Sequence, residues 1–167
     1  HNDPSMMLFL MATLKGFPFH WKTGADQLML VSVGTGTWKT HYTPDQVVDN
    51  KLWDWACEVI SMLMNDAKNT NRLMLQYLSH SPTATLLDRE VGDLSTDLLT
   101  PQPALHYLRY DAELSKENLD KLGFTDINPI DLQEMSKSEN REILAAIGTK
   151  AAAVEIEAAH FPKAFDL

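Results

Sequence analysis

The chain has 167 residues, with 14 Lys and Arg against 23 Asp and Glu, and its formal net charge is -9 at pH 7. This acidic balance, with the basic residues scattered along the chain, argues against nucleic acid as a partner and against general adsorption to an anionic membrane. The length and a hydrophobic content of 44% allow one domain with a sizeable core.

The sequence carries no sign of secretion or of membrane insertion. No apolar run is long enough to cross a bilayer, and no signal-peptide pattern is present. Cys57 is the only cysteine, so no intrachain disulfide can form, and a reducing compartment fits this usage. We expect a soluble, cytoplasmic protein that can still meet a membrane surface.

The first expected element is a helix that begins at Asp3-Pro4. Asp is favoured as an N-cap and Pro at the first helical position, and Gly16 is placed to end the helix. Residues Met6 to Met11 leave this helix without a polar face. Such a helix must be covered on several sides, which indicates a core helix against a sheet. A Met-rich lining that faces lipid is the alternative interpretation.

The next expected element is a strand over Leu28 to Val33. Six apolar or small residues in a row predict a central strand that helices cover on both faces. Gly34, Thr35 and Gly36 follow directly, and glycines allow a sharp turn and the close approach of another group. Ligands of open α/β sheets bind at this carboxyl end of the strands. These three residues are therefore candidates for a ligand-bearing edge.

The remainder of the chain is expected to be mostly helical. The segment from Ala104 to Leu114 alternates two mixed faces and predicts a strand near an edge of the sheet. The loop over residues 37–50 lies at the carboxyl edge, where loops often carry function. The other expected elements are a helix from Lys51 to about Ser79, a short helix that begins at Ser115, and a last helix from Ser138 to Phe161.

The fold class that follows is α/β, mostly helical with a few buried strands. Neither an internal repeat nor a linker divides the chain, so residues 1–167 are predicted to belong to one domain. The chain begins at His1 and enters a strong helix almost at once. We expect it to be a piece of a longer protein.

The Gly-Thr-Gly sequence raises the question of nucleotide binding. The dinucleotide fingerprint needs a third glycine where this chain has Lys39, and the Gly-Lys-Ser/Thr of a phosphate loop is missing. A lone Gly-x-Gly is a weak signal. A nucleotide-binding domain therefore ranks only third among the hypotheses.

No complete catalytic machine can be assembled from the residue types and spacings. There is no Gly-x-Ser-x-Gly nucleophile motif, and Cys57 lies in an apolar helical stretch, where a buried small residue is the simplest interpretation. The six histidines are dispersed without metal-ligand spacing. No pair of carboxylates can be singled out as acid and base. We expect neither a metal nor a cofactor.

Two short motifs follow one another at the start of the chain. The segment His1-Asn2-Asp3-Pro4-Ser5 leads into the apolar helix, and Ser32-Val33-Gly34-Thr35-Gly36 ends the strand. This order resembles the carboxyl-terminal half of patatin-like phospholipases, where an Asn-Asn-Pro-like turn precedes a helix and a strand that ends in Ser-Leu-Gly-Thr-Gly. Asp3 replaces the second Asn, and Val33 replaces Leu. Four later pieces are also similar to that family: the long helix after the loop, the strand Tyr107 to Tyr110 with Arg109, the helix start Glu117-Asn118-Leu119, and the closing His160-Phe161-Pro162.

The resemblance implies part of a three-layer α/β/α domain and a lipid acyl hydrolase that uses a Ser-Asp dyad without a metal. Both dyad residues would lie upstream of this chain, so no catalytic or substrate-binding residue is assigned to it. Asn2, Asp3 and Pro4 would support the turn of the catalytic aspartate. Gly34, Thr35 and Gly36 would lie at the ligand-bearing edge.

Partners also follow from the resemblance. The intact protein would act on a lipid or another acyl ester, and its missing amino-terminal half, or a second copy of the chain, would cover the first helix. The fragment alone is expected to be inactive. The rival hypothesis is a non-catalytic α/β module for binding or scaffolding.

Overall fold

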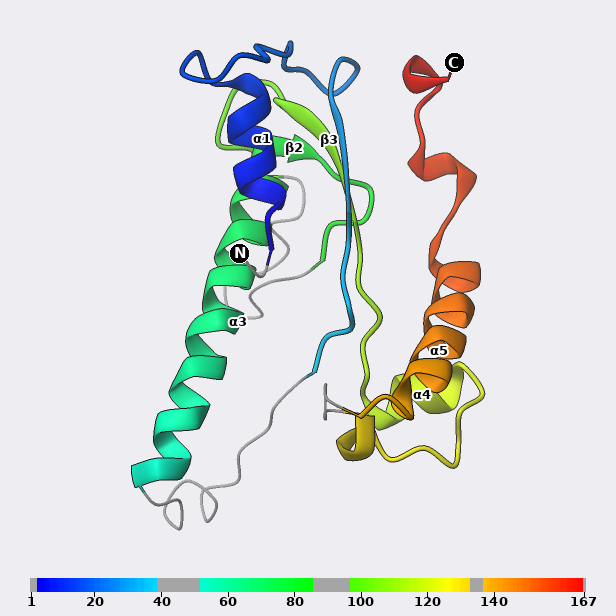
Figure 1. Ribbon diagram of the computed structural model, residues 1–167. Coiled ribbons are helices and arrows are strands. Elements are labelled where there is room, and N and C mark those ends of the chain that lie inside the picture. The colour runs from blue at the N-terminus through cyan, green and yellow to red at the C-terminus, as the bar shows by residue number, and fades with distance from the viewer. Residues whose placement is uncertain (1–2, 39–51, 86–96, 133–136, 167) are drawn as a thin grey trace. The chain divides into compact units, whose positions relative to one another are not determined.

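The computed structural model describes residues 3–38, 52–85, 97–132 and 137–166 and shows a mixed α/β fold with a small parallel sheet (Figure 1). Its longer elements are α1 (Ser5–Thr13), β1 (Met29–Val33), α3 (Leu52–Leu78), β2 (Ser79–His80), β3 (Leu105–Tyr110), α4 (Lys116–Lys121) and α5 (Asn140–Glu155). Short 3-10 turns span Pro129–Leu132, Ala158–His160 and Lys163–Phe165.

The sheet has three strands in the order β1-β3-β2. In the parallel pair of β2 and β3, Ser79 lies opposite Leu105 and His80 lies opposite His106. On the other side of β3, the His106 N–H donates to the Leu28 carbonyl at 2.8 Å. Strand β3, the last of the three along the chain, is therefore the central one.

The prediction of a central strand over Leu28 to Val33 is wrong. In the described sheet β1 lies at an edge, and its side chains are unequally covered: Val31 is 44% exposed and Val33 is 75% exposed. A continuous apolar run indicates that both faces of a strand need cover, but the described residues do not supply that cover. The strand itself is one residue shorter than expected.

The prediction that Ala104 to Leu114 forms a strand near an edge is wrong as well. Strand β3 is central, and residues 105–108 are almost fully buried. The edge position was predicted because histidine, tyrosine and arginine side chains are usually found in partly exposed strands. A polar side chain can be buried when its polar atoms find partners: Arg109 pairs with Asp111, two residues further on, and the Tyr110 hydroxyl meets His160, 50 residues further on.

Two compact units can be distinguished. The first contains residues 1–32, 42–108 and 162–167, and the second contains residues 33–41 and 109–161. Each unit has a hydrophobic core of its own. The single-domain organisation expected from the sequence stays a prediction.

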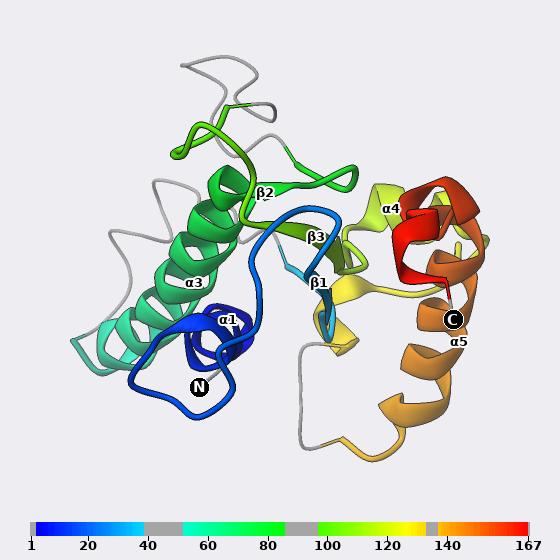
Figure 2. The ribbon, with the colours of Figure 1, turned by 90° about the horizontal axis from the view of Figure 1, so that it is seen from above.

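The core of the first unit lies between the helices α1 and α3 and strand β3. Figures 1 and 2 both show α1 beside α3. Phe9 of α1 and Leu75 of α3 belong to the same buried cluster as Leu105 and Tyr107. Because side chains alternate along a strand, the opposite face of β3 presents His106, whose ring lies 6.5 Å from that of Phe165 and 5.4 Å from that of His80.

The core of the second unit lies around α4 and α5. Leu114, Leu119, Leu132 and Ile147 are buried together. The expected helix start at Ser115 is confirmed, since its side chain accepts a hydrogen bond from the Asn118 N–H, as an N-cap does.

Helix α1 begins close to the predicted position but ends earlier. Its N-cap is Pro4 rather than Asp3, and Leu14 ends it in an extended conformation, so the prediction that Gly16 ends the helix is wrong. One face, which carries Phe9 and Ala12, is buried. Met7, Leu8 and Met11 are exposed, so the described residues cover only one side of this apolar helix.

Of the two longer helices, α3 keeps its predicted bounds within one residue at each end, and α5 is shorter than predicted. Helix α3 is continuous through the polar stretch 65–71. Helix α5 ends at Glu155 because Ile156 is extended, and a 3-10 turn at Ala158–His160 completes the segment that was predicted to be helical through Phe161.

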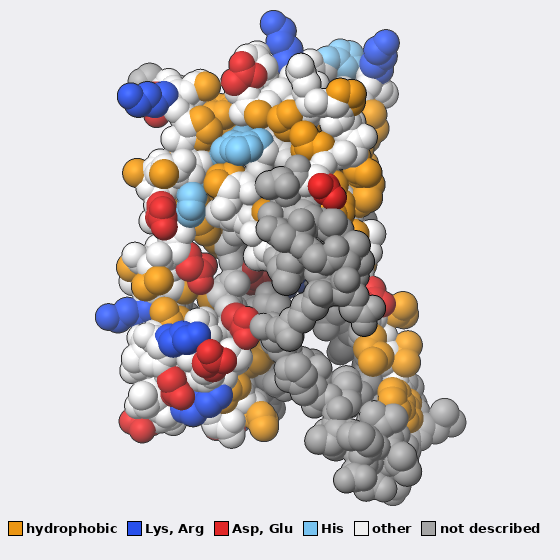
Figure 3. Space-filling view, turned by 180° about the vertical axis from the view of Figure 1, so that it is seen from behind, with side chains coloured by type: hydrophobic (Ala, Val, Ile, Leu, Met, Phe, Trp, Pro, Cys, Tyr) orange, Lys and Arg blue, Asp and Glu red, His pale blue; other side chains and the backbone are white. Residues whose placement is uncertain are grey.

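Parts of the sequence predictions lie outside the described residues. These parts are Asn2, the loop from residue 39 to residue 50, and the side chain of Cys57. Among the helices described, none combines the length and the apolar character that a membrane span requires. On the face drawn in Figure 3, the Lys and Arg side chains shown in colour lie among acidic ones and form no broad basic area.

Candidate functional site

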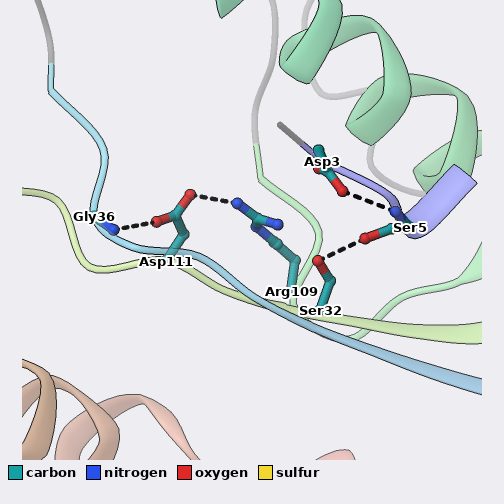
Figure 4. Close-up of polar contacts among 6 residues, drawn as sticks. All are labelled: Asp3, Ser5, Ser32, Gly36, Arg109 and Asp111. Atoms are coloured by element: carbon teal, nitrogen blue, oxygen red, sulfur yellow. Dashed lines mark hydrogen bonds and ion pairs between the residues drawn. The ribbon is translucent and has the colours of Figure 1, made fainter. Parts of the chain in front are cut away.

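A buried polar cluster holds the start of α1 in the first unit. The Ser5 N–H donates to Asp3 Oδ1 at 3.1 Å, and the Ser5 hydroxyl donates to Ser32 Oγ at 2.8 Å (Figure 4). Asn71 of α3 donates through Nδ2 to the Asp3 carbonyl at 3.2 Å. Asp3, Ser5 and Ser32 are all buried. We call these four residues the Asp3–Ser32 cluster.

The Asp3–Ser32 cluster joins residues of the two sequence motifs across 27 positions. Buried polar groups are costly unless they are paired, and each net hydrogen bond contributes about 1 kcal/mol. The cluster therefore fixes the turn before α1 against strand β1 and helix α3. Of the three turn residues chosen from the sequence, Asp3 belongs to the cluster, Pro4 is exposed, and Asn2 lies outside the described residues.

The Gly-Thr-Gly segment, residues 34–36, belongs to the second unit and runs beside the residues that follow β3. The Gly34 N–H donates to the Tyr110 carbonyl at 2.7 Å, and the Thr37 N–H donates to the Ala112 carbonyl at 2.9 Å. Between them, the Gly36 N–H donates to Asp111 Oδ1 at 3.0 Å. The segment thus continues the pairing of β1 with β3 beyond the ends of both strands.

The close approach of Asp111 explains why residue 34 is glycine. A Cβ atom at Gly34 would lie 2.0 Å from Asp111 Oδ1, which is far inside van der Waals contact. Gly36 has a φ of +105°, a conformation that side chains disfavour. Gly34 is therefore accounted for by the Asp111 carboxylate, and Gly36 by its backbone conformation and by Leu114, whose Cδ1 would lie 2.6 Å from an added Cβ.

Asp111 is the residue of this site that the sequence analysis missed. Its second oxygen, Oδ2, accepts a hydrogen bond from Arg109 Nη2 at 2.6 Å, and the two side chains are only 5% and 8% exposed (Figure 4). Residues two apart on an extended segment share a face, so the Arg-x-Asp spacing at the end of a strand was the available signal. The buried ion pair anchors the Gly-Thr-Gly segment.

A pocket of about 240 Å³ opens beside this anchor, entirely within the second unit. One wall is formed by Val33 to Gly36 and by Tyr110 to Ala112. The opposite wall is one face of α5 and the residue after it: Leu144, Ile147, Gly148, Ala151, Ala152, Glu155 and Ile156. Gly34, Thr35 and Gly36 line this pocket, and the expectation that they lie at a ligand-bearing edge stays a prediction.

Two ionisable groups around the pocket have altered proton affinities. Burial, followed by the negative charge of Asp111, raises the pKa of the Glu155 carboxyl. Burial, followed by the negative charge of Glu157, raises the pKa of Tyr110. The Tyr110 hydroxyl lies 3.0 Å from Nδ1 of His160, which holds the tyrosine at the rim. Perturbed carboxylates in a cleft are typical of functional sites.

Within the part of the chain that the structure describes, no group of three or more His, Cys, Asp or Glu side chains is placed to hold a metal ion. A scan against models of protein families finds no match, and searches of curated proteins and of solved structures find none either.

Proposed function

We propose that this chain is the carboxyl-terminal part of a patatin-like lipid acyl hydrolase, in which a serine and an aspartate that precede His1 cleave acyl esters of lipids. The observation that carries the proposal is the buried hydrogen bond between Ser5 and Ser32. It ties the Asp-Pro-Ser turn to the strand that ends in Ser-Val-Gly-Thr-Gly, and these are the two motifs whose order resembles that family.

In the proposed enzyme, a serine hydroxyl attacks the ester carbonyl and the aspartate accepts its proton as general base. Amide N–H groups of a glycine loop stabilise the oxyanion. The residues of the present chain position the catalytic groups and do not react themselves. Asn71 and Ser32 hold the turn next to the aspartate, since they bind the Asp3 carbonyl and the Ser5 hydroxyl.

The proposed intact protein has a three-layer α/β/α arrangement. The exposed apolar side chains of Met7, Leu8 and Met11 support a further layer over α1, because apolar patches on this scale are usually covered in a soluble protein. The amino-terminal half of the domain, or a second copy of the chain, provides this cover.

The test compares the 167-residue chain with the protein encoded when the upstream coding sequence is included. We expect upstream Gly-x-Ser-x-Gly and Asp-Gly-Gly motifs, and hydrolysis of a short-chain nitrophenyl ester by the longer protein only. Replacement of the motif serine by alanine should abolish that hydrolysis. A serine-dependent burst from the 167-residue chain alone would contradict the proposal.

The rival function is a non-catalytic α/β binding module or scaffold, in which the pocket of the second unit would hold the ligand. A coding sequence without either upstream motif would decide for this rival. Both functions accommodate a small ligand beside α5, so the pocket does not discriminate between them.

A further inference from the structure

The pocket of the second unit is lined on one side by small and apolar residues of α5. Residues Gly148, Ala151 and Ala152 lie on one face of α5, and because they are small they leave space between the helix and the opposite wall. Leu144, Ile147 and Ile156 make the same wall apolar. At roughly 30 Å³ for a water-sized group, a volume of about 240 Å³ accepts about eight non-hydrogen atoms.

The charges around the pocket are one-sided. Asp111 and Glu155 line it, and no Lys, Arg or His is among the described residues that do. The charge of Asp111 is balanced by Arg109 at 2.6 Å. Within the described part of the chain, Glu155 forms no ion pair, and the nearby Glu157 adds further negative potential at Tyr110.

We propose that this pocket binds a small organic cation, an ammonium group that carries a short alkyl chain. The ammonium group pairs with Glu155, and the alkyl chain lies along the apolar face of α5. A fatty acid or another anion is disfavoured, because its carboxylate would meet Asp111 and Glu155. The inference concerns the second unit alone and does not depend on the acyl hydrolase proposal.

The raised pKa of Glu155 is consistent with this ligand. The pKa is raised because burial and Asp111 disfavour the charged carboxylate. A cation in the pocket would remove that disadvantage by giving the carboxylate a partner. Charge-assisted hydrogen bonds of this kind are among the stronger ones.

The test is isothermal titration of the full chain at neutral pH with hexylammonium, with hexanol and hexanoate as probes of the same length. We expect saturable binding of hexylammonium, weaker binding of hexanol and no binding of hexanoate. Glu155→Gln should weaken hexylammonium about tenfold, in line with the loss of one charged pair. Glu142→Gln removes the same charge from an exposed position of the same helix and should leave the affinity unchanged.

A second variant tests the apolar wall. A Cβ at Gly148 would meet no atom within 4 Å, so Gly148→Leu fills the pocket without a backbone clash and should abolish binding. Ala153→Leu is the matched control, because Ala153 is exposed on α5 and does not line the pocket. Circular dichroism checks that each variant keeps its helix content.

The outcomes separate the proposal from its alternatives. Binding of hexanol as tight as that of hexylammonium would overturn it, as would an affinity that neither Glu155→Gln nor Gly148→Leu changes. Sedimentation with phosphatidylethanolamine vesicles, competed by hexylammonium, would assign the ammonium group to a lipid headgroup. Binding of hexylammonium without vesicle binding would assign it to a free amine.

Discussion

At the scale of single residues, Asp111 is the one that holds the Gly-Thr-Gly wall of the second unit's pocket in place. It accepts from the Gly36 N–H through one oxygen and from Arg109 through the other. A buried ion pair contributes little by itself, but removal of one partner leaves the other charge without compensation. The position of the carboxylate also sets what the neighbouring backbone can be, since it leaves no room for a side chain at residue 34.

We predict opposite effects for the same substitution at two glycines. Gly34→Ala should lower the free energy of unfolding by about 1–3 kcal/mol or more, because the new methyl group overlaps Asp111. Gly148→Ala, inside α5 with open space around its Cβ, should raise it by about 0.5–1 kcal/mol. Urea unfolding of both variants measures the difference, and a neutral Gly34→Ala would show that Asp111 does not lie against residue 34.

Glu155 gives a pH-dependent prediction. Its pKa in the folded chain lies above the ordinary value of 4.5, so the folded state holds its proton over a range in which the unfolded state has released it. In that window, which begins near 4.5, this group makes stability fall as the pH rises. The Glu155→Gln variant should therefore be more stable than the parent chain at neutral pH. Its free energy of unfolding should also change less with pH in this window.

The control for that experiment is Glu142→Gln. Glu142 lies in the first turn of α5, where a negative charge interacts favourably with the helix dipole. Its replacement should lower the stability at neutral pH, opposite in sign to the change at Glu155. Thermal unfolding at a series of pH values measures both, and equal shifts for the two variants would contradict the assignment.

At the scale of elements, helix α4 shows how much a local signal can establish. Its six residues begin after Ser115, whose hydroxyl oxygen accepts from the Asn118 N–H at 3.3 Å. Two exposed pairs four residues apart, Lys116 with Asp120 and Glu117 with Lys121, add little because they are solvated. The buried residue of the helix is Leu119, which ties α4 to the core of the second unit.

Ser115→Ala should destabilise the chain by about 1 kcal/mol through the loss of this cap. Ser138→Ala is the matched control, because Ser138 precedes α5 and that helix has no side-chain cap hydrogen bond. Chemical unfolding of the two variants should show a loss for the first and almost none for the second. A loss of equal size in both would mean that the Ser115 cap is not what stabilises α4.

At the scale of the whole molecule, the exposed apolar face of α1 leads us to expect that another protein segment covers it. Helix α1 buries the face with Phe9 and Ala12 and exposes Leu8 at 52%. If a second copy of the chain, or the amino-terminal half that we propose, covers that face in the intact protein, the isolated chain should self-associate and bind a hydrophobic dye.

Leu8→Lys should reduce that association, since burial of a charge in an apolar interface is costly. Leu99→Lys changes a leucine with a similar exposure, 59%, outside α1 and serves as the control. Sedimentation velocity measures the oligomer fraction of each. A parent chain that is monomeric and binds no dye would count against the covered face.

The sequence by itself determined the local features of this protein. The start of α1, the strand before Gly34, the helix start at Ser115 and the helical stretches around α3 and α5 all follow from caps, glycines and hydrophobic spacing. These signals depend on residues a few positions apart, so they can be read along the chain. They also placed the Gly-Thr-Gly segment correctly at the end of a strand.

Only the tertiary structure decided which strand is central and what the glycines face. The order β1-β3-β2 depends on which strands pair, and the burial of β3 depends on the distant segments that pack against it, among them α1 and α3. Asp111 meets Gly36 across 75 positions, and Tyr110 meets His160 across 50. No local pattern encodes such contacts between residues far apart in the sequence. They arise from how distant segments pack together and not from the propensity of either segment.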